Sequence, residues 1–354
     1  MTTARLTGLG AYVPPRIVTN DELSTTLDTS DEWIRTRTGI RERHIIDPDT
    51  STSDLATEAG RRALTNAGLT SVDMLILATT TPDHPCPATA PHVAARLSLG
   101  TIPAFDLAAV CSGFIYALHS AASMIRSGSA DRVLVIGAET FTSILDPQDR
   151  GTRPIFGDGA GAVTVERSDD TNSGGALLDF DLGSDGSLVD LIAIPGGGSK
   201  DRASSAGSAD PYFRMQGPSV FRAAVTRMTE SSRAVMNRSS WRPEDVDWLV
   251  AHQANVRIIE TVGTDLSIAS DRAVINLDLV GNTSAASIPL ALADHASRGM
   301  FTPGDKVLLT AFGGGVTWGS ASLLWPTLAP VDQVLDRTPE LTTADHADTA
   351  LLTH

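Results

Sequence analysis

The chain is poor in cysteine and in long apolar segments. Its 354 residues include two cysteines, Cys86 and Cys111, which excludes a framework of several disulfides and favours a reducing compartment. No apolar run approaches the roughly 20 residues that span a bilayer. The N-terminus also lacks the basic segment and apolar core of a secretory signal. We therefore expect a cytoplasmic protein that does not bind membranes.

Positive charge is scarce as well. The sequence has 27 lysines and arginines against 42 acidic residues, a formal net charge of −15, and its lysines are Lys200 and Lys306. So acidic a chain is not expected to bind nucleic acid, and an acidic protein partner would need a local basic patch. Clusters with the ligand spacing of a zinc site are absent from the sequence, and no metal is expected.

An internal repeat organises the chain. "VDML" at 72–75 recurs as "VDWL" at 246–249, "DRVLV" at 131 as "DKVLL" at 305, and "CSGFIYAL" at 111 aligns with "AASIPLAL" at 285, always 174 residues apart. We interpret this repeat as two duplicated α/β halves with mostly parallel strands and crossover helices. The predicted parts are a first half at 1–170, a second half at 171–326, and a peripheral or disordered acidic tail at 327–354. The Gly/Ser-rich stretch 196–210 is interpreted as a loop in the connection between the halves.

Cys111 lies between a predicted strand and a predicted helix. Residues 105–110 are apolar enough for a short buried strand, and the apolar spacing from Phe114 to Ile125 predicts one face of a helix. A thiol at a helix start meets unpaired N–H groups and the positive dipole end, which favour the thiolate. The other interpretation is a small buried residue without reactivity.

Three further features lie at predicted strand ends or helix starts. His252 ends a strand, where ligand sites in α/β sheets usually lie, Asn282 precedes a helix, and the glycines 313–315 follow another strand. Each could be structural: a satisfied histidine, a helix cap and a turn. Together with Cys111 they suit acyl transfer, in which a thiolate attacks a thioester and backbone N–H groups hold the oxyanion. The glycine-rich stretch 156–163 lacks the flanking strand and helix of a dinucleotide loop and is interpreted as a close-packed turn.

Six segments in order carry a resemblance to a known family. "DTSDEWIRTRTGIRERHI", "AFDLAAVCSGF", "DRGTRPIFGDGAGA", "HQANVRII", "GNTSAAS" and "AFGGGVTWGS" resemble the β-ketoacyl-acyl-carrier-protein synthase III family of the thiolase superfamily, over about residues 3–326. The resemblance implies a five-layered thiolase-like α/β fold, with two duplicated halves, central sheets and helices between them, in a homodimer. It also implies that an acyl-CoA primer is condensed with malonyl acyl carrier protein, without a bound cofactor, to start fatty-acid or polyketide chains.

The resemblance assigns roles to individual residues. It makes Cys111 the nucleophile, His252 and Asn282 the decarboxylation pair, and the backbone N–H groups of Cys111 and Gly314 the oxyanion hole. Phe312 would line the active site, and Cys86 would end the acyl pocket of the partner subunit. The residues implied in binding CoA are Thr29, Trp33, Arg37, Arg150, Gly217 and Asn255. Those implied in docking the carrier protein are Arg222 and Arg257.

Departures from the family pattern leave alternatives open. Ala251 stands where the family usually has proline, Cys86 where it often has phenylalanine, and the tail is longer than usual. A related acyltransferase that forms an ester or amide without decarboxylation is one alternative, and a non-catalytic CoA- or carrier-binding scaffold is another. The intact pair of His252 and Asn282 favours condensation. The identity of the primer and the choice between pathways are not predicted.

Overall fold

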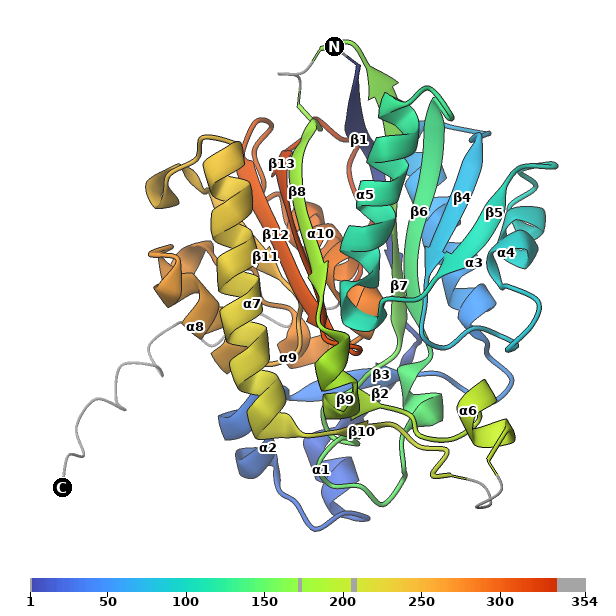
Figure 1. Ribbon diagram of the computed structural model, residues 1–354, viewed down its shortest axis with the longest axis vertical. Coiled ribbons are helices and arrows are strands. Elements are labelled where there is room, and N and C mark those ends of the chain that lie inside the picture. The colour runs from blue at the N-terminus through green and yellow to red at the C-terminus, as the bar shows by residue number, and fades with distance from the viewer. Residues whose placement is uncertain (1, 171–173, 205–208, 336–354) are drawn as a thin grey trace.

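The computed structural model describes residues 2–170, 174–204 and 209–335, and two mixed sheets form its centre (Figure 1). The first sheet has the order β1-β7-β6-β4-β5 and the second the order β8-β13-β12-β11. The strands of the first sheet are β1 (Thr3–Tyr12), β7 (Gly159–Ser168), β6 (Arg132–Glu139), β4 (Met74–Ala78) and β5 (Ala104–Leu107). Those of the second are β8 (Leu177–Ser184), β13 (Thr317–Leu324), β12 (Lys306–Gly313) and β11 (Trp248–Ala251).

Both sheets contain more antiparallel pairing than the sequence predicted. Strands β6, β4 and β5 are parallel, as are β11 and β12, but β1 and β7, like β13 and β8, run antiparallel to their neighbours. The prediction of mostly parallel strands was therefore wrong. Strands covered on both faces are apolar throughout, and their pattern carries no information about direction.

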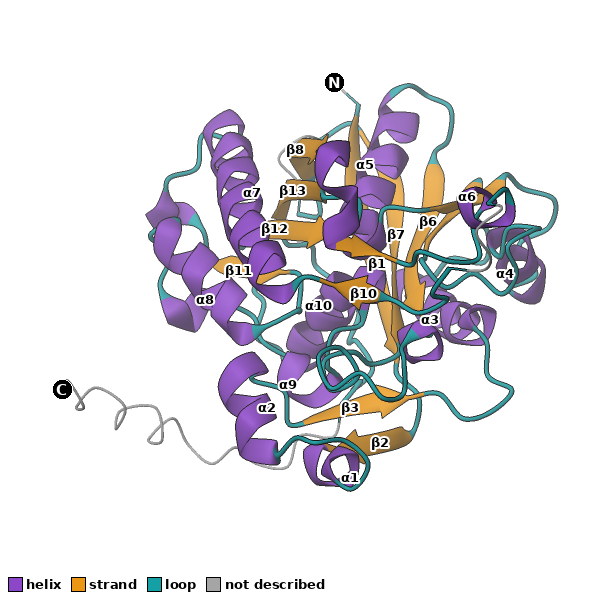
Figure 2. Cartoon of the chain, turned by 60° about the horizontal axis from the view of Figure 1, so that its bottom comes forward, coloured by secondary structure: helices purple, strands orange, loops and turns teal. Residues whose placement is uncertain are grey.

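Helices complete five layers (Figures 1 and 2). Helix α3 covers the outer face of the first sheet, α5 and α10 lie between the sheets, and α7 with α8 covers the outer face of the second. Their bounds are α3 (Thr52–Ala67), α5 (Gly113–Arg126), α10 (Ser287–Ser297), α7 (Gly217–Arg238) and α8 (Val256–Asp265). The central helices are apolar nearly all round because each meets a sheet on two sides.

The repeat is visible element by element. Strands β4 and β11 begin 174 residues apart, as do β6 and β12, and α5 and α10. The short 3₁₀ turns that precede the two central helices, η1 (Val110–Ser112) and η6 (Ser284–Ala286), obey the same offset. Duplication therefore places the two helix starts, with Cys111 and Ser284, in equivalent positions.

Smaller elements cover the lower end of the molecule in Figure 1, where the central helices begin. They are β2 (Arg16–Thr19), α1 (Asn20–Ser24), α2 (Asp31–Thr38), β3 (Glu42–Ile45), β9 (Ile192–Ala193), α6 (Ser199–Arg202), β10 (Arg214–Met215) and α9 (Leu277–Val280). Helix α4 (Ala90–Arg96) lies beside β5. Two predictions for this chain need correction. The stretch 196–210, interpreted as a loop, contains α6, and 156–163, interpreted as a turn, runs into β7.

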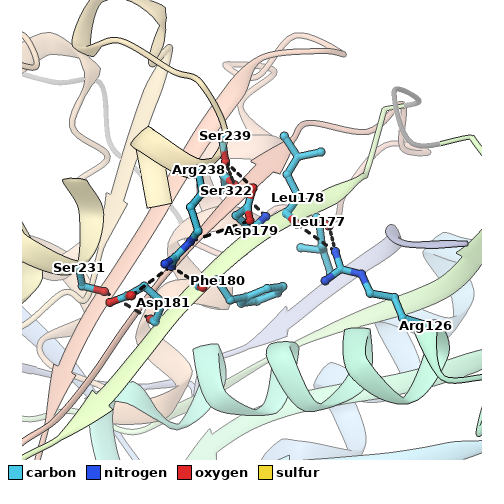
Figure 3. A network of polar contacts seen from close by, with 10 residues as sticks. All are labelled: Arg126, Leu177, Leu178, Asp179, Phe180, Asp181, Ser231, Arg238, Ser239 and Ser322. Atoms are coloured by element: carbon cyan, nitrogen blue, oxygen red, sulfur yellow. Dashed lines mark hydrogen bonds and ion pairs between the residues drawn. The ribbon is translucent and has the colours of Figure 1, made fainter. Parts of the chain in front are cut away.

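The edge strand β8 is held from both sides by arginines (Figure 3). The Arg126 guanidinium at the end of α5 donates to the carbonyls of Leu177 and Leu178, and Arg238 at the end of α7 donates to Phe180 O at 2.7 Å. Arg238 also pairs with Asp181 at 3.1 Å. These contacts tie the last turns of two helix layers to the sheet between them.

Part of the predicted tail packs on the body. Asn66 in α3 donates to the carbonyls of Ala329 and Pro330 at 3.0 and 3.2 Å, and Leu335 is buried. Residues 336–354 of that tail lie outside the described residues. Over the described ranges, no helix has the length and apolar character that crossing a membrane requires.

Candidate active site

Cys111 lies in η1, between the end of β5 and the start of α5. The strand predicted at 105–110 ends at Leu107, because Val110 turns the chain into a left-handed conformation with φ of 49°. That conformation is strained for a β-branched residue and marks a backbone held by its surroundings. Cys111 itself is buried.

The loop after β12 closes over this turn. A Cβ atom at Gly313 would lie 2.8 Å from the Cys111 amide nitrogen, so only glycine allows the two backbones to approach this closely. The Thr317 hydroxyl donates to Ala109 O or Gly314 O, each at 3.1 Å, and so links the two loops. Gly314 lies against Val110, since a Cβ there would be 3.1 Å from the valine side chain.

His252 and Asn282 are oriented by hydrogen bonds on their far sides. His252 follows β11, and its Nδ1 shares a hydrogen bond of 2.6 Å with the Ser287 hydroxyl at the start of α10. The Asn282 side-chain oxygen accepts from the Ser284 N–H at 2.9 Å. Each contact uses one polar atom of the side chain and leaves the other, Nε2 of His252 and Nδ2 of Asn282, for a ligand.

The three side chains meet at one cavity. Cys111, His252, Asn282 and Phe312 line it together, although they come from four separate segments. The rest of its wall is apolar: Phe156, Ile192, Phe213, Met215, Val220, Ala224, Met228, Ala254 and Ile258. Sequence reasoning missed this wall because its residues come from β9, β10, α7 and α8, and no local motif marks them.

Burial sets the protonation of the site. It raises the pKa of the Cys111 thiol to about 12 and lowers that of His252 to about 3, so the resting site holds a neutral thiol and a neutral imidazole. The sequence-based expectation of a thiolate was wrong. A helix dipole is worth roughly 0.3–1 kcal/mol in most settings, less than the cost of burying a charge.

A buried carboxylate lies near the thiol. Glu139, the last residue of β6, is fully buried, and burial raises its pKa to about 7. Ser284 connects it to the site, because the serine hydroxyl donates to Glu139 Oε1 at 3.0 Å and also forms a hydrogen bond with Cys111. Sequence reasoning missed Glu139, although its position at the end of an apolar strand was a signal.

The residues implied in CoA binding gather near α2. The Trp33 ring lies 5.0 Å from the Arg37 guanidinium carbon and 5.3 Å from that of Arg150, which pairs with Asp28 at 2.7 Å. Thr29, in the loop before α2, has a buried hydroxyl without a hydrogen-bond partner.

Asn255 and Gly217 begin helices beside them. Asn255 caps α8, accepting from the Arg257 N–H at 2.9 Å, and donates to Arg37 O at 2.8 Å. Gly217 begins α7, and the space where its Cβ would lie is open. Asn255 thus ties α8 to the end of α2.

The remaining predicted residues are exposed. Arg222 on α7 and Arg257 on α8 lie close together, since Arg257 stacks over Phe221 with 5.8 Å between the guanidinium carbon and the ring centre. Cys86 is exposed in the loop between β4 and α4. No group of three metal-ligating side chains occurs within the residues that the structure describes.

Comparisons with known proteins agree with this geometry. Models of 3-oxoacyl-[acyl-carrier-protein] synthase III and of its C-terminal part match residues 105–186 and 236–325. The chain is 60% identical over 325 residues to beta-ketoacyl-[acyl-carrier-protein] synthase III 5 of Streptomyces coelicolor, covering 91% of this chain and 97% of the relative.

Solved structures with similar folds include 3-oxoacyl-(acyl carrier protein) synthase III of Pseudomonas aeruginosa, with a TM-score of 0.87 at 49% identity, covering 93% of this chain and 100% of that one. Another is the priming β-ketosynthase of the R1128 polyketide pathway, with a TM-score of 0.85 at 34% identity, covering 92% and 96%. The chain therefore belongs to the 3-oxoacyl-[acyl-carrier-protein] synthase III family.

Proposed function

We propose that this enzyme is an acyltransferase that starts acyl chains by decarboxylative Claisen condensation of an acyl-CoA primer with malonyl acyl carrier protein. The observation that carries the proposal is the shared cavity of Cys111, His252 and Asn282, with an apolar wall that fits an acyl chain. Two of these side chains present one polar atom to the cavity because the other is already bonded.

The first half-reaction loads the primer. The Cys111 sulfur attacks the thioester carbonyl, and the C–S bond to CoA breaks as the acyl–cysteine bond forms. Backbone N–H groups of Cys111 and Gly314 would stabilise the oxyanion, and the close approach of their two loops supports this assignment. Phe312 lies beside the sulfur in the same cavity wall.

The second half-reaction forms the carbon–carbon bond. Loss of carbon dioxide from the malonyl thioester leaves an enolate, whose oxygen carries the developing charge. With the Ser287 hydroxyl donating to Nδ1, His252 carries its ring proton on Nε2 and can donate it to that oxygen. The Asn282 amide donates beside it. The enolate carbon then attacks the acyl–cysteine and expels the Cys111 sulfur.

The substrates would reach the cavity from the end that carries α2. Trp33 with Arg37 and Arg150 offers a flat aromatic face and two cations, which suit the adenine and phosphates of CoA. Thr29, Gly217 and Asn255 lie nearby on the proposed path. Arg222 and Arg257 would meet the acidic carrier protein, since both are exposed on neighbouring helices.

A homodimer is part of this proposal, because Cys86 is exposed in its own subunit and would close the acyl pocket of the partner. Cysteine is smaller than phenylalanine, so the pocket would accept longer or branched primers, at roughly 0.8 kcal/mol or about fourfold per buried methylene. Cys86→Phe should shift preference toward acetyl-CoA in competitive loading. Unchanged chain-length preference would remove Cys86 from the pocket.

Intact-mass analysis tests the central claim. Cys111→Ala should lose acyl loading from every acyl-CoA in a panel, and an adduct that persists would overturn the proposal. His252→Ala and Asn282→Ala should still load but lose condensation by about 10²-fold or more. A wild-type enzyme that loads yet transfers its acyl group to an alcohol or amine, without releasing carbon dioxide, would instead be a non-decarboxylating acyltransferase.

A further inference from the structure

Glu139 is a buried carboxylate with neutral hydrogen-bond partners. The Thr80 N–H donates to its two oxygens at 3.1 and 3.0 Å, the Thr81 hydroxyl donates at 2.8 Å, and the Ser284 hydroxyl at 3.0 Å. Within the described residues, none of the groups that affect its pKa is a lysine, arginine or histidine. A carboxylate in such a place is costly to keep ionised without a cation.

Its neighbours come from three elements and leave one titratable contact. The residues after β4 contribute Thr79, Thr80 and Thr81, and η6 contributes Ser284, all of them uncharged. The titratable neighbour is Cys111 in η1, whose pKa the Glu139 charge raises. A change of charge on either group is therefore felt by the other.

The hydroxyl of Ser284 connects the two groups in one direction. Because Ser284 donates its own proton to Glu139 Oε1, its oxygen is free to accept the thiol proton of Cys111. The resulting chain runs from the Cys111 S–H to Ser284 Oγ and from the Ser284 O–H to the carboxylate. Both hydrogen bonds point the way that a proton would travel.

His252 is poorly suited to the same task. Burial keeps its pKa near 3, so it binds a proton weakly, whereas the Glu139 carboxylate with a pKa of about 7 binds one readily. Moving the thiol proton to Glu139 also avoids a second negative charge in the buried site. The acylated enzyme then holds a neutral thioester and a neutral carboxylic acid.

We propose that Ser284 and Glu139 form a proton relay that removes the Cys111 thiol proton during acylation and returns it when the product leaves. As the sulfur–carbon bond forms, the thiol proton passes to Ser284 Oγ while the serine proton passes to Glu139, and the CoA thiolate leaves to be protonated by solvent. After the enolate attack expels the Cys111 thiolate, the same two protons move back. Glu139 acts through Ser284 and is a positioning residue.

The relay rests on the proposed role of Cys111, and alkylation by iodoacetamide tests it apart from CoA chemistry. In a Cys86→Ser background Cys111 is the remaining thiol, and its alkylation rate is followed from pH 5 to 9 by intact mass. With the relay, the rate should rise about tenfold per pH unit below pH 7 and level off above it, as Glu139 ionises. A rate that falls as pH passes through 7 would mean that Glu139 acts only by repulsion and would overturn the relay.

Two variants and a matched control complete the test. Glu139→Gln and Ser284→Ala should each lose the inflection near pH 7, and acyl loading at pH 7.5 should drop about 10²-fold. Asp158→Asn removes another fully buried carboxylate, which is bonded to Thr142 instead, and should keep the inflection. An unchanged profile in Glu139→Gln or in Ser284→Ala would overturn the relay. An inflection without acyl loading from any CoA would keep the relay and reject the proposed function.

Discussion

His252 Nδ1 and the Ser287 hydroxyl lie 2.6 Å apart at the point where the end of β11 meets the start of α10. Both residues are buried, so this short contact decides which ring nitrogen of the neutral imidazole carries the proton. Ser287 thereby prepares the His252 Nε2–H for a ligand in the cavity.

Replacing this serine should separate the two half-reactions. Ser287→Ala should lower condensation about tenfold, the effect of losing roughly 1.4 kcal/mol of transition-state stabilisation. Acyl loading should change little, because Cys111 and its loop are untouched. Single-turnover assays with pre-acylated enzyme measure the difference. Ser239→Ala, which breaks a 2.6 Å Ser–Ser contact remote from the cavity (Figure 3), is the control and should leave both steps intact.

The approach of Gly313 to Cys111 predicts intolerance of any side chain. A Cβ atom at Gly313 would lie 2.8 to 2.9 Å from backbone atoms of 109–112, so Gly313→Ala should push the nucleophile loop away. We expect the free energy of unfolding to fall by about 1–3 kcal/mol, as for other overpacked cores, together with a loss of acyl loading. Gly186→Ala, where nothing lies within 4 Å of the added atom, should change neither. Normal loading by Gly313→Ala would show that the two loops need not touch.

Much of the site could be predicted because it lies at repeated strand ends and helix starts. Cys111, His252 and Asn282 stand at such boundaries, and the offset of 174 residues places Val110 and Ser284, each with φ of 49°, in equivalent turns. Hydrophobic periodicity and local motifs are enough to locate positions of this kind.

Other features depend on contacts that no local pattern records. The apolar wall joins residues more than 100 positions apart, and the degree of burial at Cys111 reversed the expected charge state. Glu139 looked like the end of an ordinary strand, because its partners Thr81 and Ser284 come from distant segments. Strand direction also escaped, since β7 and β13 are apolar on both faces.

Charge reversal tests the carrier-docking surface. Arg222→Glu with Arg257→Glu should weaken use of malonyl carrier protein about tenfold or more, because a chain of net charge −15 otherwise repels an acidic partner. Loading from acyl-CoA should change much less. Arg167→Glu with Arg242→Glu alters the net charge equally at two other exposed arginines and serves as the control. Equal effects of both pairs on condensation would mean that net charge alone governs the encounter.

The pKa of Glu139 predicts how stability depends on pH. In the unfolded chain this carboxyl has an ordinary pKa of 4.5, whereas in the folded protein burial raises it to about 7. Between these values the folded state binds more protons than the unfolded state, so the contribution of Glu139 is full below pH 4.5 and is lost as pH rises through 7. At about 1.4 kcal/mol per pKa unit, wild type should lose about 3 kcal/mol of unfolding free energy relative to Glu139→Gln over that window.

Urea denaturation of both proteins at pH 4.5, 5.5, 6.5 and 7.5 measures this difference, because the other titrating groups are common to both. Thr81→Val removes a donor that stabilises the charged carboxylate at 2.8 Å, so in that variant the loss should extend to higher pH. Parallel stability curves for wild type and Glu139→Gln would show that Glu139 titrates in the folded protein as it does in the unfolded chain.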